Sequence, residues 1–238
     1  MDPFTLPFLS SALEFVVATL ETLATTLEPV AGGFSAAASI VLVTVIVRAA
    51  LIPAGIAQAR ADRGRARLAP RLTALRDRHR NDPERLQRET MKLYRDEKVS
   101  PTAGCLPVLV QAPIVGLLYA AFLHGTVAGR ANTLLTETVL GVPLGASLAG
   151  SVATGGPSLP TLLVFGTVII VIAGVGEISR RAFRVVGAPA ALAGALGAAQ
   201  FATAVVAAFV PLAAGLYLTV TVVWTLVQRL VLRRAFPA

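Results

Sequence analysis

Five long apolar stretches follow one another along this chain of 238 residues, and most charged residues lie in the segments between them. Each stretch is long enough to cross about 30 Å of hydrocarbon, or nearly so, when it is helical. They run over residues 35–56, 106–124, 159–175, 190–210 and 212–232. The pattern predicts an all-α, polytopic membrane protein with five transmembrane helices.

The first 33 residues predict a different kind of helix. Their polar residues recur at helical spacing on a background of mostly Leu, Val, Phe and Ala. These polar residues are Glu14, Glu21, Thr25 and Glu28. A helix with one polar stripe lies in the membrane interface more readily than it crosses the bilayer. We therefore expect residues 1–33 to form an extracytoplasmic, interfacial amphipathic helix, with a sixth span as the alternative.

The charged segment between the first two spans has the pattern of two amphipathic helices. Asp82 and Pro83 mark the start of the second helix, because Asp is a favoured N-cap and Pro is tolerated at the first helical position. The leucines of the two apolar faces are Leu68, Leu72, Leu75, Leu86 and Leu93. We expect an antiparallel helical hairpin over residues 58–100. A solvated loop is the alternative, but it would leave both apolar faces without a partner.

Composition and charge agree with a membrane chain. Hydrophobic residues make up 55% of the sequence and charged residues only 14%, which excludes an ordinary soluble domain. The net charge of +8 comes with thirteen of the 21 Lys and Arg residues in the segment 60–98, and most others directly follow apolar stretches. Basic loops stay in the cytoplasm, so we expect the N-terminus outside, the C-terminus inside and the hairpin in the cytoplasm. The distribution does not indicate specific nucleic-acid recognition.

Arg48 is the one charge inside the first apolar stretch. A guanidinium stays protonated, and it costs roughly 3 kcal/mol or more at the centre of a membrane helix without water or a partner. Snorkelling to the inner headgroups is the alternative. The residue lies about 8–12 positions from the cytoplasmic end of the span, roughly 12–18 Å at helical rise, which exceeds the reach of one side chain. We therefore expect a hydrated site around Arg48.

Three stretches resemble the YidC/Oxa-type family of membrane protein insertases. The first is Leu42-Val-Thr-Val-Ile-Val-Arg48-Ala-Ala-Leu-Ile-Pro53, and it is similar to the family's first core span with its single arginine. The second runs from Asp82-Pro-Glu through Met91-Lys-Leu-Tyr-Arg-Asp-Glu-Lys-Val-Ser-Pro101 to Gln111-Ala-Pro113. The third runs from Val210-Pro-Leu-Ala-Ala-Gly-Leu-Tyr217 to Trp224-Thr-Leu-Val-Gln228. The resemblance covers residues 40–238, within an insertase core of residues 34–238.

The resemblance implies an insertase or chaperone of the bacterial cytoplasmic membrane. Such a protein moves the polar flank of a nascent membrane protein through a hydrophilic groove that is open to the cytoplasm and to lipid, and then releases the apolar segment laterally. Candidate groove residues are Arg48, Thr44, Gln111, Thr219, Thr221 and Gln228. Candidate residues for client capture on the hairpin are Leu72, Leu75, Leu86 and Leu93. Its partners are nascent membrane proteins and the bilayer, and the sequence leaves the ribosome and the Sec translocon open.

The chain shows no signature of an enzyme. A Walker-type glycine-rich loop, a set of His and Cys at metal-binding spacing and a nucleophile triad are all missing, so we expect no cofactor and no metal. Two other functions stay open. A small-anion transporter or channel would use Arg48 as its binding charge, although an inverted repeat is not visible. A purely structural assembly partner would need no groove.

Overall fold

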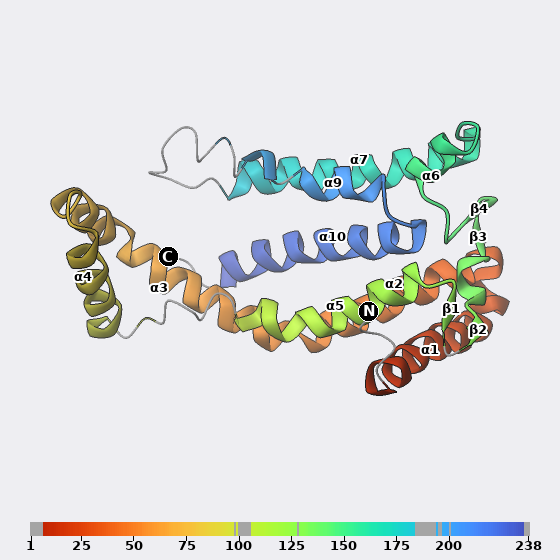
Figure 1. Ribbon diagram of the computed structural model, residues 1–238, viewed down its shortest axis with the longest axis horizontal. Coiled ribbons are helices and arrows are strands. Elements are labelled where there is room, and N and C mark those ends of the chain that lie inside the picture. The colour runs from red at the N-terminus through yellow and green to blue at the C-terminus, as the bar shows by residue number, and fades with distance from the viewer. Residues whose placement is uncertain are drawn as a thin grey trace. The chain divides into compact units, whose positions relative to one another are not determined.

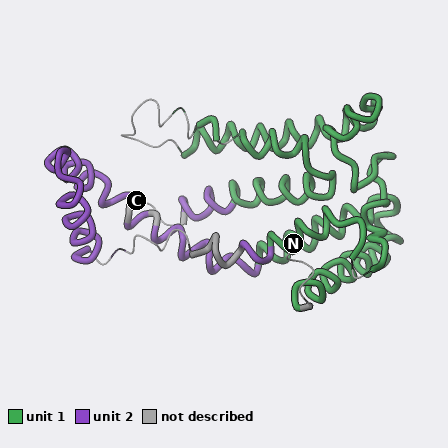
Figure 2. The backbone as a smooth tube through the Cα atoms, viewed as in Figure 1, with its two compact units in different colours: residues 1–49, 115–227 green, residues 50–114, 228–238 purple. Residues whose placement is uncertain are grey.

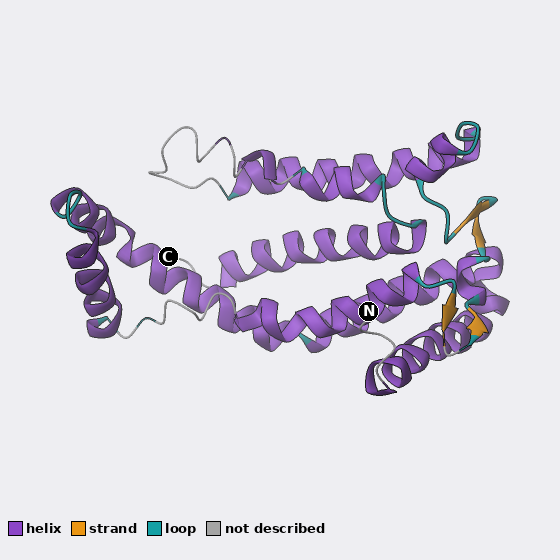
Figure 3. Cartoon of the chain, in the orientation of Figure 1, coloured by secondary structure: helices purple, strands orange, loops and turns teal. Residues whose placement is uncertain are grey.

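The computed structural model is almost entirely helical (Figure 3). It describes residues 7–97, 99, 106–127, 129–183, 194, 197–199 and 201–235. The helices, labelled in Figure 1, are α1 (Pro7–Ala31), η2 (Gly32–Phe34), α2 (Ser35–Ala50), α3 (Ile52–Arg78), α4 (Pro83–Asp96), α5 (Leu106–Leu123), η3 (Thr133–Leu135), α6 (Leu148–Ala153), α7 (Leu159–Ala182), α9 (Ala202–Ala207) and α10 (Leu212–Ala235). Strands β1 (Thr126–Val127) and β2 (Arg130–Ala131) form one short hairpin, and β3 (Thr138–Val139) and β4 (Val142–Pro143) form another. The all-α fold class is confirmed.

Three of the described stretches are long and apolar enough to cross a membrane, namely Phe8–Ala50, Leu159–Ala182 and Leu212–Arg234. Helix α5 matches the predicted second span in its bounds. Part of the predicted fourth span, residues 190–210, lies outside the described residues, and its described part includes the short helix α9. The count of five spans therefore stays a prediction.

The helices divide into two compact units, coloured separately in Figure 2. Unit 1 comprises residues 1–49 and 115–227, and unit 2 comprises residues 50–114 and 228–238. Unit 1 thus holds α1, α2, the loop after α5, α7 and most of α10. Unit 2 holds α3, α4, the first half of α5 and the end of α10.

The core of unit 1 surrounds the first half of α10. Leu212, Ala213 and Ala214 are completely buried there. Helix α7 approaches α10 so closely that a Cβ added at Gly215 would stand 3.5 Å from Val168. Small residues at the start of α10 therefore allow neighbouring helices to pack against it on several sides.

The segment between α5 and α7 packs against the start of α10. The backbone N–H groups of Leu212 and Ala213 donate to the carbonyls of Ala146 and Leu144, at 2.8 and 2.9 Å. These are among the N–H groups that a helix start leaves without an intrahelical partner. Leu134 and Leu144 from the same segment are 1% and 0% exposed. The segment is therefore a folded part of unit 1 rather than a loose loop.

Unit 2 contains the predicted helical pair. The side chain of Asp82 accepts a hydrogen bond from the N–H of Arg85 at 2.9 Å, and Pro83 opens α4, so the predicted N-cap is confirmed. An ion pair joins Arg71 of α3 to Glu97 just after α4. The pair also contacts α10, because the guanidinium of Arg63 donates to the carbonyl of Leu232 at 2.9 Å.

The predicted first span, residues 35–56, is not one helix. Helix α2 ends at Ala50 and α3 begins at Ile52, with Leu51 between them outside helical geometry at φ −88° and ψ 3°. Pro53 in the first turn of α3 explains the break, because it has no N–H to donate to the carbonyl of Ala49 four residues earlier and its ring clashes with that carbonyl. Arg48 consequently lies in the last turn of α2 instead of mid-helix.

Substitution of the N-cap tests the hairpin. Asp82→Ala should destabilise the first turn of α4 by about 1 kcal/mol, because the N–H of Arg85 loses its acceptor. Hydrogen exchange of the full-length protein should then show amides of that turn opening about fivefold more often. Asp96→Ala, at the opposite end of α4, is the matched control and should leave the first turn unchanged. Equal exchange in both variants would contradict the cap.

Candidate functional site

The inner face of α2 carries Ile40 and Thr44, one turn apart, which are 1% and 2% exposed. Ser39, nearer the start of the helix, is 0% exposed. On the side opposite Thr44, Leu42 and Ile46 are 38% and 56% exposed. A water-soluble helix has the opposite arrangement, with its apolar residues inside. The two buried hydroxyls donate within the helix itself, from Ser39 to Ala36 and from Thr44 to Ile40.

Arg48 continues this inner face. It follows Thr44 by four residues, one helical turn, and its side chain is partly buried. The guanidinium lies close enough to the phenol of Tyr217 on α10 to interact with it electrostatically. The charge therefore faces the interior of unit 1 and a polar partner, not the apolar outer surface of α2.

Packing holds Tyr217 in position. Its side chain is only 5% exposed. Its ring lies 6.4 Å from that of Phe122 on α5, centroid to centroid, at an angle of 48° between the ring planes. Aromatic pairs at this distance and tilt attract each other. A phenol fixed in this way presents its oxygen to Arg48 in a defined direction.

Thr221 follows Tyr217 by one turn and therefore lies on nearly the same side of α10. Its hydroxyl oxygen is buried and has no hydrogen-bond partner among the described residues. A buried polar atom normally has a protein or water partner, since leaving it without one costs about 1–3 kcal/mol. The face of α10 that carries Tyr217 is thus polar at two successive turns.

The structure distributes the other predicted groove residues over different places. Thr219 lies about 200° around α10 from Tyr217, and its hydroxyl donates to the carbonyl of Gly215 at 2.8 Å. Gln228 belongs to unit 2, where its side chain lies directly against Gly55 of α3. Gln111 is in α5, and its side chain lies outside the described residues.

The four leucines proposed for client capture lie on α3 and α4 and are all partly buried: Leu72, Leu75, Leu86 and Leu93. Leu68 is the most buried side chain of α3 at 3% exposed, while Met91 on α4 is 50% exposed. The apolar faces of the hairpin are therefore partly covered and partly accessible.

Sequence reasoning missed two members of the site. Ser39 gives no signal beyond its spacing on α2. Tyr217 was visible as part of the last span, but nothing in the sequence pairs it with an arginine so distant along the chain. Among the described residues, no group of three or more His, Cys, Asp or Glu side chains comes together as a metal site would require.

An all-α chain with apolar outer helix faces and a cation on an inner face defines a polytopic membrane protein. The chain belongs to the family described as 60Kd inner membrane protein, whose sequence model matches residues 27–238. It is accordingly a protein of the bacterial cytoplasmic membrane.

Several relatives are named membrane protein insertase YidC. One from Clostridium perfringens is 40% identical over 84 residues, 35% of this chain and 35% of that protein. One from Ralstonia nicotianae is 43% identical over 81 residues, 34% of this chain and 15% of the relative. One from Fusobacterium nucleatum is 34% identical over 96 residues, 40% of this chain and 47% of the relative. The matched stretches thus span less than half of each relative.

The contact between Arg48 and Tyr217 predicts energetic coupling. Arg48→Met and Tyr217→Phe should each lower the Tm of the purified protein. The double variant should lose less than the two single losses combined, by about 1 kcal/mol of coupling, because the same contact between the two side chains is removed twice. Thr219→Ala replaces Tyr217→Phe in the control cycle and should be additive with Arg48→Met. Additive losses in the first cycle would show that the two side chains do not interact.

Proposed function

We propose that the chain is a membrane protein insertase that lowers the barrier to moving a polar segment through hydrocarbon. The observation that carries this proposal is the position of Arg48 on the inner face of α2. A fixed positive charge partway into the membrane attracts the acidic or polar flank of a client, which would otherwise cross the apolar phase alone. The names of the relatives, membrane protein insertase YidC, support the same activity.

In this proposal, water reaches Arg48 through a groove that opens to the cytoplasm and to lipid. The partnerless hydroxyl of Thr221 supports hydration, because water is the simplest partner for a buried polar atom. The folded segment over the start of α10 supports closure toward the exterior, because Ala146 and Leu144 are bonded directly to that helix end. The groove therefore lets the polar flank of a client enter from the cytoplasm, and it holds water across only part of the membrane.

The apolar part of the client leaves sideways. Leu162, Leu163 and Ile170 of α7 are 48%, 61% and 71% exposed, which is typical of a surface in contact with acyl chains. Burial of apolar surface yields roughly 25 cal/mol per Å², so transfer into lipid drives the last step. No nucleotide is required.

The cytoplasmic hairpin of α3 and α4 receives the client first. Its partly covered leucines and the exposed Met91 can hold an apolar segment for a limited time, since a flexible methionine side chain adapts to different partners. Ribosome and Sec translocon are further partners that fit a cytoplasmic position of this hairpin.

The charge of Arg48 is tested by insertion of a single-span client with an acidic outer tail into vesicles that contain the purified protein. Arg48→Ala should lower the inserted fraction by about tenfold, the effect of an attraction of about 1.4 kcal/mol in a partly hydrated site. Arg48→Lys keeps the charge and should retain most of the activity. Equal insertion by the wild type and the alanine variant would refute a role for the charge.

The same vesicles distinguish the second candidate function, a small-anion transporter or channel, which the guanidinium of Arg48 also favours. Uptake of chloride or phosphate that depends on Arg48, in the absence of client insertion, would support transport. We expect client insertion without such uptake.

Replacement of residues 60–98 by a short Gly-Ser linker tests the hairpin. An insertase should lose client capture, measured as photocrosslinking of a nascent membrane protein to the remaining chain, because the receiving surface is gone. A purely structural assembly partner would not capture clients in either form. Undiminished crosslinking after the replacement would remove the hairpin from the mechanism.

A further inference from the structure

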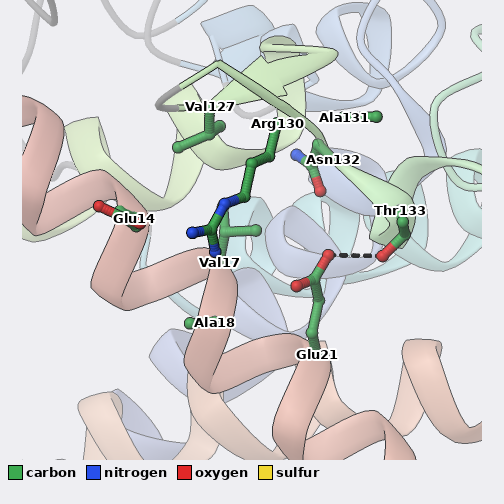
Figure 4. Close-up of a pocket in the computed structure, with 9 residues that line it drawn as sticks. All are labelled: Glu14, Val17, Ala18, Glu21, Val127, Arg130, Ala131, Asn132 and Thr133. Atoms are coloured by element: carbon green, nitrogen blue, oxygen red, sulfur yellow. Dashed lines mark hydrogen bonds between the residues drawn. The ribbon is translucent and has the colours of Figure 1, made fainter.

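A pocket of about 270 Å³ lies between α1 and the segment after α5, apart from Arg48 and its partners (Figure 4). Glu14 and Glu21 reach it from α1, and Arg130, Asn132 and Thr133 reach it from β2 and the residues that follow. All five residues belong to unit 1. Figure 4 shows the guanidinium of Arg130 extending toward α1 between the two glutamates. Such a collection of charges on an outer segment has no part in the insertion mechanism.

Asn132 gives the pocket a defined chemistry. Asn132 is only 3% exposed. The amide nitrogen donates to the carbonyls of Ala121 and His124 at 2.7 and 3.0 Å, and these two bonds use both of its hydrogens. The orientation of the amide is thereby fixed. Its oxygen is a buried acceptor that no donor among the described residues meets.

The glutamates add acceptors next to this oxygen. Glu21 is held in place by the hydroxyl of Thr133, which donates to it at 2.5 Å. Glu14 is exposed and lies seven residues, two turns, before Glu21 on the same side of α1. With Arg130 as the one cation, these three charged side chains give the pocket a formal charge of −1. A ligand group that supplies N–H donors and a positive charge fits the acceptors best, and a primary ammonium has three such donors.

Arg130 supplies the opposite chemistry in the same pocket. A guanidinium binds phosphate through two parallel hydrogen bonds and is well suited to that anion. A ligand that carries an ammonium and a phosphate a few ångströms apart can therefore satisfy both sides of the pocket at once. Phosphoethanolamine has this arrangement.

The position of the pocket along the chain indicates a lipid as the source of that group. The lining residues 127–133 begin four residues after the apolar helix α5 ends at Leu123. Helix α1 leads through η2 directly into the apolar helix α2. The pocket thus lies shortly after the end of the apolar helix α5, where lipid headgroups lie. Phe8 and Phe15 on α1 are 82% and 74% exposed, which suits contact with acyl chains.

We propose that this pocket binds the headgroup of a lipid with a primary ammonium and a phosphate, such as phosphatidylethanolamine. The ammonium lies at Glu21 and the amide oxygen of Asn132, and the phosphate lies at Arg130. A pocket of about 270 Å³ has room for such a headgroup. The bound lipid would join α1 to the outer segment of unit 1.

The headgroups of two common lipids match only some of the groups that line the pocket. Phosphatidylcholine carries a quaternary ammonium without N–H donors, so the oxygen of Asn132 stays unsatisfied. Phosphatidylglycerol has no cation and places its phosphate beside two carboxylates. Selectivity for the primary ammonium is therefore the signature of the site.

The test is a lipid titration of the full-length protein followed by native mass spectrometry. Dioleoylphosphatidylethanolamine should bind about tenfold more tightly than the corresponding choline and glycerol lipids, since hydrogen bonds to charged groups contribute about 1.5 kcal/mol or more each. Glu21→Gln and Arg130→Gln should each remove most of this preference. Glutamine at position 21 keeps an acceptor for the hydroxyl of Thr133, so the substitution leaves that hydrogen bond in place. Glu28→Gln, on the same helix but outside the pocket, is the matched control and should change nothing.

A soluble competitor separates the lipid from other amines. Glycerophosphoethanolamine should compete with the lipid in the wild type and not in the Glu21→Gln variant. Equal binding of the ethanolamine and choline lipids would overturn the proposal, because Arg130 would then only pair with the glutamates. Competition by a lysine-rich peptide without any effect of glycerophosphoethanolamine would overturn it too, in favour of a client segment. Lipid binding is read directly, so the result does not depend on insertase activity.

Discussion

The permanent charge of Arg48 is the constraint that the rest of unit 1 accommodates. A guanidinium cannot lose its proton, so a membrane helix that carries one must turn it toward water or a polar partner. Helix α2 does so by placing Arg48 on the same side as the buried Thr44, one turn before it, while Leu42 and Ile46 lie exposed on the other side. Helix α10 supplies the phenol of Tyr217 beside the guanidinium, and Thr221 one turn further. A short polar path thus runs along the facing sides of two otherwise apolar helices.

The two ends of α10 have different hydrogen-bond partners, and this difference gives the proposed insertion its direction. The first N–H groups of α10 donate to Ala146 and Leu144, so the segment after α5 covers that end with main-chain hydrogen bonds. Near the other end, the last carbonyls include that of Leu232, which accepts from Arg63 at the root of the hairpin. A cation at a helix C-terminus is favoured by the helix dipole. One end is therefore sealed by folded backbone, and the other carries the charged surface that we propose meets the client.

Most of the fold could be predicted from the sequence, because its signals are local. Apolar runs gave the positions of the long helices, and Asp82 with Pro83 gave the start of α4 correctly. The break at Leu51 was missed because hydropathy stays high across it, although Pro53 carried the signal. The β3–β4 turn was not predictable, since its strands have two residues each and Leu140 adopts an unusual φ of 53° beside Gly141. The candidate site was harder, because the partners of Arg48 come from segments far apart in the chain.

Accessibility of single cysteines to a membrane-impermeant thiol reagent tests the central claim most directly. In a background with Cys105→Ala, cysteines replace Thr44, Arg48 and, as a lipid-facing control, Ile46, and the reagent is added from one side of the membrane at a time. The account predicts labelling at positions 44 and 48 from the cytoplasm, no labelling from the exterior, and none at position 46 from either side. Labelling of position 48 from the exterior, or its complete protection from both sides, would contradict a hydrated site that is closed outward.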